Sequence, residues 1–371
     1  MKFGLQFGSV IGGLSSFLVG LIAIFGCHYL AKYTNLFDKP DQLRKFHARV
    51  TPNSGGIGIA IAYSLGLALS CYLATGGITD NMIHFAPYFL IGTTIIIALG
   101  VIDDISGISS KTKLLIQLAA AIVTCAGLEI TFMDGFLAGT SRGAASVFLL
   151  KGGLYILFAF WIVSITNSIN LVDGVDGLAS VLALLVMAGI LIIGISWGIT
   201  EYSIILYPLA GAVLAFLVFN RPPAYIFMGD TGSLLIGYVL ATIALMLAIQ
   251  AQHWMHSISL IILFGFPLLD TLLAVIRRIG NNVSPFESDS NHLHHLLQRH
   301  YNGAGMVILV IGSISLLLTI IGIVLATTTD PLLFYLLFGL TALAFVFTVV
   351  LYSLNGNKNT MKFKAGSHPR K

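Results

Sequence analysis

The sequence has few charged residues. Only 9% of its 371 residues are Asp, Glu, Lys or Arg, against about 25% in a typical soluble domain. Because a water-exposed surface needs charge to stay in solution, this scarcity excludes a soluble enzyme. It also excludes a disordered chain, which would be rich in charge. With 57% hydrophobic residues and a mean hydropathy of +0.94, the composition predicts an integral membrane protein that contacts the lipid bilayer.

Cysteine is scarce as well. Cys27, Cys71 and Cys125 all lie in apolar runs, and three residues so spaced form neither a disulfide framework nor a metal-binding pattern. The net charge of +4 is too small to indicate a nucleic-acid partner. A cleavable signal peptide is not expected, because the first apolar run, Leu5–Leu30, is longer than a signal core and lacks a basic region and cleavage site. We interpret this run as the first membrane span.

Long apolar runs dominate the chain instead. A membrane-spanning helix needs about 20 mostly apolar residues, and eleven runs reach or approach this length. The period-two alternation of β-barrel strands is missing, so the predicted fold class is an all-α integral membrane protein with about eleven transmembrane helices. The runs cover 5–30, 55–75, 86–102, 113–128, 152–170, 178–196, 202–219, 230–250, 257–278, 306–326 and 332–354. We expect one polytopic domain over 1–354 and a basic tail over 355–371.

Basic residues indicate the orientation of these spans. When the loops are assigned alternately to two sides, 16 of the 19 Lys and Arg residues fall on one side. The positive-inside rule makes that side cytoplasmic, so the N-terminus is predicted outside and the C-terminus inside. Nine of the 15 acids share the cytoplasmic side. Since the rule does not count acids, their presence there indicates a polar site at that face.

Two cytoplasmic segments early in the chain carry candidate groups. The first, before Thr51, contains Lys45 and His47, which either bind phosphate or belong to a basic loop that only sets topology. The second contains Asp103 and Asp104, with Lys111 and Lys113 close behind. Adjacent carboxylates are costly near a bilayer and repel each other unless a cation or a shared proton intervenes. They predict a Mg²⁺ site or a proton-handling pair.

The third segment reads N-x-x-N-x-x-D-G-x-D-G-L. Asn167 and Asn170 are three residues apart, as are Asp173 and Asp176. Spacing of three places side chains on one face at the end of a helix. Asp-Gly pairs alone indicate a tight turn, but four amide and carboxylate groups at one helix end exceed what a turn needs.

The fourth segment runs from Asn220 through Phe227 to Asp230 in F-M-G-D-T-G-S. Asp230 can cap the helix that follows. A capping aspartate at a helix N-terminus is also well placed to hold a metal while backbone N–H groups face phosphate oxygens. Both interpretations remain open at this point.

The fifth segment combines Arg277 and Arg278 with the histidines His292, His294 and His295. Zinc is one candidate ligand, but neither cysteine nor a third ligand supports it in the sequence. Phosphate contacts from these cations are the preferred interpretation. Within the ninth span, Pro267 is expected to kink the helix.

Taken together, these motifs resemble the polyprenyl-phosphate N-acetylhexosamine-1-phosphate transferase superfamily. The resemblance rests on Asp-Asp, N-x-x-N-x-x-D-G-x-D-G-L, F-M-G-D-x-G-S and H-x-H-H in order on successive cytoplasmic loops. The stretch S-P-F-x-x-D-x-x-H-x-H-H resembles the branch that uses UDP-GlcNAc and undecaprenyl phosphate. The peptidoglycan branch carries three consecutive histidines, and Leu293 departs from that pattern.

The resemblance implies a reaction, a cofactor and partners. Members transfer an N-acetylhexosamine-1-phosphate from a UDP-sugar to a polyprenyl phosphate and release UMP. The implied metal is Mg²⁺, with Mn²⁺ as an alternative. The implied location is the bacterial cytoplasmic membrane, with the active site on the cytoplasmic face and a homodimer as one possible assembly. The product would start a cell-envelope polysaccharide such as O-antigen.

It also implies roles for individual residues. Asp230 corresponds to the metal-holding aspartate, with Asp104 as a second metal ligand. The implied catalytic residues are Lys45, Asp103, Asp104, Asp173, His294 and His295. The implied substrate-binding residues are His47, Asn167, Asn170, Asp176, Asn220, Phe227, Arg277, Arg278 and His292. Among these, Asp176, Asn220 and Phe227 correspond to a uridine pocket.

Alternatives remain at this stage. A phospho-MurNAc-pentapeptide transferase of peptidoglycan synthesis is the second candidate. A transporter is a remote third, because transporters place polar groups near the middle of the membrane. Only Asp270 lies deep in a predicted span, and its sequence context does not decide between a catalytic role and a structural hydrogen bond.

Overall fold

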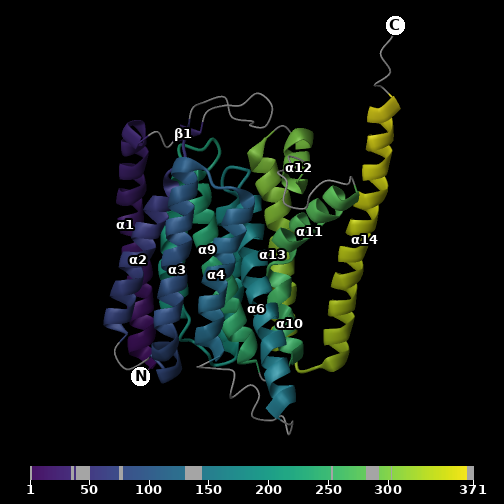
Figure 1. The fold of residues 1–371 in the computed structure, drawn as a ribbon. Coiled ribbons are helices and arrows are strands. Elements are labelled where there is room, and N and C mark those ends of the chain that lie inside the picture. The colour runs from purple at the N-terminus through teal and green to yellow at the C-terminus, as the bar shows by residue number, and fades with distance from the viewer. Residues whose placement is uncertain are drawn as a thin grey trace.

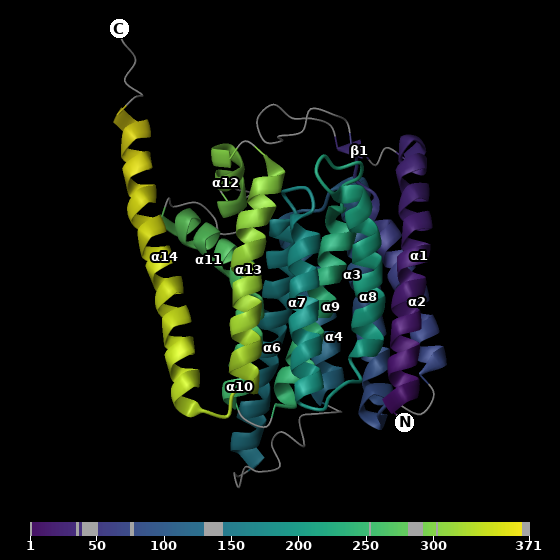
Figure 2. The ribbon, with the colours of Figure 1, turned by 180° about the vertical axis from the view of Figure 1, so that it is seen from behind.

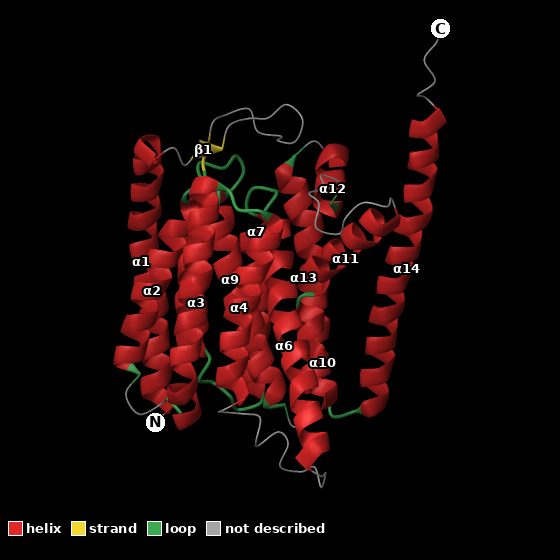
Figure 3. Ribbon diagram, viewed as in Figure 1, coloured by secondary structure: helices red, strands yellow, loops and turns green. Residues whose placement is uncertain are grey.

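The computed structural model describes residues 2–34, 37–38, 51–74, 78–129, 144–251, 254–280, 292–301 and 303–365. Almost all of them are helical (Figure 3). The helices are α1 (Lys2–Thr34), α2 (Gly55–Leu73), α3 (Asp80–Ser106), α4 (Ser110–Leu128), α6 (Ala144–Val172), α7 (Leu178–Ser196), α8 (Ser203–Asn220), α9 (Gly229–Ile249), α10 (Trp254–Leu263), α11 (Gly265–Gly280), α12 (Leu293–Tyr301), α13 (Ala304–Thr327) and α14 (Pro331–Ala365). A two-stranded antiparallel sheet pairs β1 (Phe37–Asp38) with β2 (Thr51–Pro52).

Ten helices of the described chain are long and apolar enough to cross a membrane, and a bent pair brings the number to eleven. This confirms the predicted all-α membrane fold with about eleven spans. The helix α1 begins at one end of the bundle, and α14 ends at the other (Figure 1), as an odd number of crossings requires. The orientation of the bundle in the membrane and the boundary between the membrane domain and the tail stay predictions.

Helix α9 lies at the centre of the bundle. In its most apolar window 89% of the residues are buried, against 22% in α1 and 6% in α14. It packs against α2, α3, α6, α7 and α10. Close approach depends on glycine: a Cβ added at Gly100 of α3 would lie 2.4 Å from the Cα of Thr231 in the first turn of α9. The beginning of α9 is therefore tightly placed against its neighbours.

The ninth apolar run is broken, as Pro267 predicts. Helices α10 and α11 meet at 70°, with Phe264 between them. Proline lacks the N–H that would bond to the carbonyl of Leu263, and its ring clashes with that carbonyl, so α10 ends there. Pro267 itself lies in the first turn of α11, where a missing N–H costs little. Helix α11 then runs sideways towards α14 (Figure 2).

Most of the predicted polar segments lie at one end of the bundle. The end of α3, the beginnings of α2, α4 and α9, and helix α12 all lie at the end of the bundle that carries β1 in Figure 1. This is the end that the basic residues predict to be cytoplasmic. The chain order thus alternates between the two ends and brings distant motifs to the same face.

Candidate active site

A lysine lies between two carboxylates of different helices. Asp103 is in the last turn of α3, Lys113 in the first turn of α4 and Asp230 in the first turn of α9. The Nζ of Lys113 lies 2.7 Å from Oδ2 of Asp103 and also forms an ion pair with Asp230. All three side chains are partly buried. Sequence reasoning noted Lys113 but gave it no role, because its contact with Asp230 joins segments more than a hundred residues apart.

Asp104 caps the N-terminus of α9. Its Oδ1 accepts the N–H of Asp230 at 2.8 Å and the side-chain amide of Asn53 at 3.3 Å. Its Oδ2 accepts the N–H of Thr231 at 3.0 Å and the hydroxyl of Thr231 at 2.6 Å. A carboxylate offers about four acceptor positions, and here protein donors fill them. The cap of α9 is therefore supplied by α3, and the metal role of Asp104 stays a prediction.

Gly229 permits this arrangement. Its φ of +68° is a left-handed conformation that favours glycine. An added Cβ would lie 2.7 Å from Oδ1 of Asp104. The glycine of the F-M-G-D motif thus lets the backbone approach the capping carboxylate.

The two asparagines of α6 have different partners. The side-chain amide of Asn170 donates to Oδ1 of Asp230 at 3.0 Å and to Oγ of Ser233 at 2.9 Å. Asn167, one turn deeper, forms a reciprocal amide pair with the buried Gln117 of α4. Asn170 therefore orients Asp230, whereas Asn167 joins α6 to α4. Gln117 carried no sequence signal, since an amide in an apolar run fits many positions.

Asp173 follows α6 and faces the other acids. Burial raises the pKa of its carboxyl well above the usual range, and the negative charges of Asp230, Asp104 and Asp176 raise it further. A carboxyl group in such surroundings either keeps its proton or associates with a cation.

Hydrogen bonds join the loop after α6 to the loop before α9. Oδ2 of Asp176 accepts the N–H of Ala224 at 3.0 Å. Asn220 is buried, and its Oδ1 accepts the N–H of Gly177 at 2.7 Å while its Nδ2 donates to the carbonyl of Ile226 at 2.8 Å. Asn220 thus holds the two loops together, and its predicted contact with uridine stays a prediction.

Phe227 is fixed through its backbone. Its N–H donates to the carbonyl of Pro52 at 2.8 Å, and its carbonyl accepts the N–H of Gly55 at 3.0 Å. The neighbouring carbonyl of Met228 accepts the N–H of Gly56 at 2.8 Å. The segment before α9 therefore runs along the beginning of α2, with the Phe227 side chain partly exposed.

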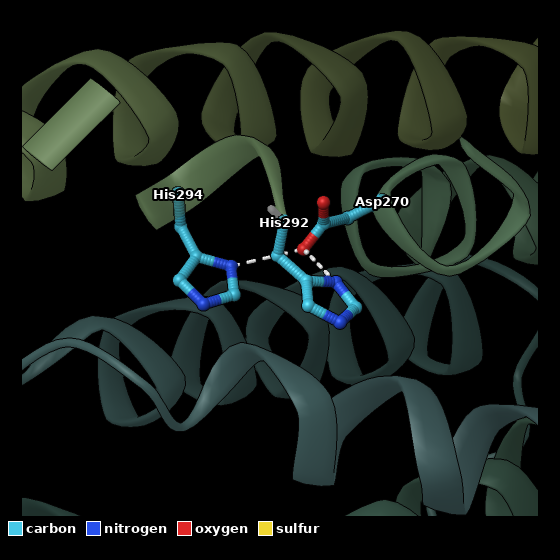
Figure 4. A group of neighbouring side chains, drawn as sticks. All are labelled: Asp270, His292 and His294. Atoms are coloured by element: carbon cyan, nitrogen blue, oxygen red, sulfur yellow. Dashed lines mark hydrogen bonds and ion pairs between the residues drawn. The ribbon is translucent and has the colours of Figure 1, made fainter. Parts of the chain in front are cut away.

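Asp270 contacts the histidine segment. Its Oδ1 accepts the N–H of Leu293 at 2.7 Å. Its Oδ2 lies 2.9 Å from Nδ1 of His294 and 3.3 Å from Nδ1 of His292 (Figure 4). Asp270, His292 and His294 are all buried, and their potential ligand atoms lie within 4.8 Å of one another. Asp270 thus lies directly beside His292 and His294, a contact that the sequence did not predict.

The histidines also meet the loop after α6. A Cβ added at Gly174 would lie 2.7 Å from Nε2 of His294 and 2.9 Å from Cε1 of His295. The ring centroids of His294 and His295 are 4.2 Å apart. Since Gly174 directly follows Asp173, the H-x-H-H and D-G-x-D-G motifs form one site.

Four of the predicted residues stay without a structural test at this site. Lys45 and His47 lie outside the described residues. Arg277 and Arg278 are in the last turn of α11, where Arg278 is buried. Their predicted contacts with phosphate stay predictions.

The donor set fits a hard divalent cation. Asp103 and Asp230 share the ammonium group of Lys113, and the charge of Asp230 acts on Asp173. Carboxylate oxygens are the ligands that Mg²⁺ prefers. The ammonium group of Lys113 lies between Asp103 and Asp230, which marks this position as one that favours positive charge. These three carboxylates could therefore hold Mg²⁺.

Comparison with known proteins agrees with this geometry. Residues 86–248 match the sequence model of glycosyl transferase family 4. The probable undecaprenyl-phosphate N-acetylglucosaminyl 1-phosphate transferase of Bacillus subtilis strain 168 is 35% identical, over 88% of this chain and 86% of that protein. The undecaprenyl-phosphate alpha-N-acetylglucosaminyl 1-phosphate transferase of Escherichia coli K12 is 31% identical, over 77% and 75%. The decaprenyl-phosphate N-acetylglucosaminephosphotransferase of Mycobacterium leprae is 31% identical, over 72% and 71%.

These similarities extend over most of the chain and favour an enzyme over a transporter. The matched region holds Asp103, Lys113, Asn170, Asp173 and Asp230, which the structure brings together at one end of the bundle. The protein is therefore a multi-pass membrane enzyme of glycosyl transferase family 4, in the superfamily of polyprenyl-phosphate N-acetylhexosamine-1-phosphate transferases.

Proposed function

We propose that the protein transfers GlcNAc-1-phosphate from UDP-GlcNAc to undecaprenyl phosphate. An oxygen of the lipid phosphate bonds to the β-phosphorus of UDP-GlcNAc, the bond between that phosphorus and the bridging oxygen breaks, and UMP leaves with the oxygen. The products are undecaprenyl-diphosphate-GlcNAc and UMP. The observation that carries this proposal is the meeting of three carboxylates, a lysine and the H-x-H-H histidines at one membrane end in a member of this family.

Mg²⁺ is the proposed cofactor, and Mn²⁺ is an alternative. Asp103, Asp173 and Asp230 would hold it, with Asn170 orienting Asp230. When bound, the ion would neutralise charge and polarise the β-phosphorus. Without a cation, three carboxylates in one region would repel the anionic substrates.

The charge of the substrates explains the need for further cations. The UDP-sugar diphosphate carries about −2 and the lipid phosphate about −1.5 to −2 at neutral pH. One divalent ion leaves about half of this charge uncompensated. We assign the remainder to Lys113 and the histidines, together with Lys45, Arg277 and Arg278. Lys113 is already placed at the carboxylates in this structure.

Direct attack is the proposed course of the reaction. A phosphate monoester with a second pKa near 6 is mostly dianionic at neutral pH, so a general base contributes little. Asp103 would then hold the metal and Lys113 rather than remove a proton. A covalent phosphosugar intermediate on an aspartate is the alternative, and it predicts exchange of labelled UMP into UDP-GlcNAc without lipid.

The site is proposed to face the cytoplasm of a bacterial inner membrane. The support is that 16 of the 19 basic residues fall on the loops of that side. Phe227, Asp176 and Asn220 lie at the same end of the bundle and would enclose the uridine.

The test is a reconstituted assay with purified protein, undecaprenyl phosphate, Mg²⁺ and a panel of UDP-sugars, in which UMP release is measured. We expect turnover of UDP-GlcNAc and its loss in Asp230→Asn and Asp103→Asn, with membrane insertion retained. Turnover of UDP-MurNAc-pentapeptide alone would assign the protein to the peptidoglycan branch. Full activity of Asp230→Asn would contradict the proposed site.

A further inference from the structure

Asp270 is a buried carboxylate whose polar partners, among the described residues, all lie in one segment of the chain. It is 1% exposed, and the groups that bond to its carboxylate belong to His292, which directly precedes α12, and to Leu293 and His294 in the first turn of α12. A buried carboxylate is costly unless it is well bonded. The carboxylate of Asp270 on α11 is therefore bonded to the segment that carries the histidines, and each fixes the position of the other (Figure 4).

The contact determines the proton position on His294. An ionised carboxylate only accepts hydrogen bonds, so the Nδ1 of His294, 2.9 Å from Oδ2 of Asp270, carries a proton. The other ring nitrogen, Nε2, is buried and has no hydrogen-bond partner among the described residues. It lies beside Gly174, in the loop that carries Asp173 and Asp176. The structure thus leaves one polar atom of His294 available towards the site.

We propose, on the basis of the function proposed above, that Asp270 is a positioning residue that turns Nε2 of His294 towards the diphosphate of the UDP-sugar. A carboxylate at Nδ1 fixes the orientation of an imidazole and stabilises its protonated form. The Nε2–H of the protonated ring donates a hydrogen bond to a phosphate oxygen of the departing UMP. The proton stays on His294 throughout, and only the bond between phosphorus and the bridging oxygen breaks.

The backbone contact has a second effect. By accepting the N–H of Leu293, Asp270 holds the first turn of α12 against α11. The side chain of Leu293 packs against the apolar cluster that includes Val172 and Phe266. Leu293, between His292 and His294, therefore contributes an apolar side chain that packs in this cluster and a backbone N–H that bonds to Asp270. A third histidine at this position would not provide the same apolar packing.

The test compares Asp270→Asn, His294→Gln and the double variant by steady-state kinetics with UDP-GlcNAc. Because the hydrogen bond strengthens as charge develops on the leaving group, we expect kcat to fall about 10- to 100-fold in Asp270→Asn. The KM for UDP-GlcNAc should change less than about threefold. Since Asp270 acts through His294, the double variant should be no slower than His294→Gln alone.

Thr271→Ala is the matched control. Thr271 follows Asp270 on the same helix, and its hydroxyl bonds to Ser168 and to the carbonyl of Pro267. The substitution removes hydrogen bonds from α11 without touching the histidines, so kcat should be retained. A similar loss in Thr271→Ala would show that α11 is merely sensitive to change and would overturn the proposal.

Two other results would also overturn it. One is additive losses in the double variant, and the other is a rise in KM with kcat unchanged. Should Asp270→Asn fail to fold, ¹⁵N-histidine NMR of the wild-type protein, assigned with His294→Gln, supplies an independent measurement. Protonated Nδ1 on His294 supports the proposal, whereas an unprotonated Nδ1, or a stoichiometric zinc ion, contradicts it. The NMR measurement does not depend on turnover. If the proposed reaction is wrong, the wild-type protein releases no UMP from UDP-GlcNAc, and the NMR result still tests the contact between Asp270 and His294.

Discussion

Lys113 places one ammonium group between carboxylates of two helices. In the absence of a divalent ion, this lysine reduces the repulsion between Asp103 and Asp230. If metal and substrate bind as proposed, its charge is available to the phosphate groups. Lys113 can therefore reduce the repulsion between the carboxylates before metal binds and contribute positive charge to the phosphates of bound substrate.

We expect Lys113→Met to bind metal more tightly and to turn over more slowly. Removal of the lysine charge raises the negative potential at the carboxylates, so the affinity for Mn²⁺ should increase about 3- to 10-fold. The kcat should fall because a charge facing the phosphates is lost. Electron paramagnetic resonance measures Mn²⁺ binding, and UMP release measures turnover. Weaker Mn²⁺ binding in Lys113→Met would show that the lysine organises the carboxylates rather than competing with the ion.

Unlike Lys113, which reduces repulsion in the site, the ionised Asp173 destabilises the folded protein. Its raised pKa means that the folded protein favours the protonated form more than the unfolded chain does. The ionised group therefore destabilises the fold as the pH rises above about 4, the usual pKa of aspartate.

Asp173→Asn should consequently raise the melting temperature in EDTA at neutral pH, by about 2–4 °C if the repulsion amounts to about 1 kcal/mol. The difference between variant and wild type should shrink as the pH is lowered towards 4. Scanning fluorimetry in detergent at several pH values makes the measurement. Activity should be lost in the same variant. An Asp173→Asn protein that melts below the wild type at neutral pH would show that the carboxylate stabilises the fold.

At the scale of elements, α9 begins at a cap that α3 provides. Asp104 bonds to the first N–H groups of α9, and Asp230 lies in that same turn. The position of Asp230, the proposed metal ligand, therefore depends on the packing of α3 against α9.

We expect Asp104→Ala to destabilise the protein by about 1–2 kcal/mol, the usual cost of a lost N-cap. The kcat should fall about 100-fold, because a displacement of about 1 Å at reacting groups has that effect. Thr79→Ala is the control, since Thr79 caps α3 at the opposite end by accepting the N–H of Met82 at 3.3 Å. It should lower the melting temperature and leave kcat intact. Lost activity with unchanged stability in Asp104→Ala would instead assign Asp104 to the metal or the substrate.

Sequence reasoning was most successful for single elements. Long apolar runs and Pro267 are local signals, and they predicted the spans and the break between α10 and α11. The partners of individual side chains were not predictable in this way. Asp270 and His294 belong to different helices, as do Asn167 and Gln117, and only packing brings them together. Asp104 was assigned to chemistry, and its capping contacts became visible only with α9 in place.

At the scale of the whole molecule, sidedness can be tested directly. The loop at Arg221 lies at the same end as the site, and Asp330 lies between α13 and α14 at the other end; both are exposed. In a chain with its three cysteines replaced by alanine, Asp330→Cys should react with a membrane-impermeant maleimide in intact cells. Arg221→Cys should react only after permeabilisation. The reverse pattern would invert the predicted topology.

The motif order in the chain also predicted that the site would gather at one face. Spans of alternating direction return every second loop to the same side, so the order of the loops was sufficient. Depth within the membrane was not predictable: Asp270 appeared isolated in a span, yet the break before Pro267 turns α11 so that this carboxylate reaches the histidines.

The distribution of the site along the chain has a consequence for its synthesis. The carboxylates and Lys113 are complete once α9 has been made, but His292, His294 and His295 follow α11. A nascent chain arrested between residues 250 and 291 would hold the acids without the histidines. Such a chain should bind a divalent ion yet release no UMP, because it would hold the proposed metal site without the histidines.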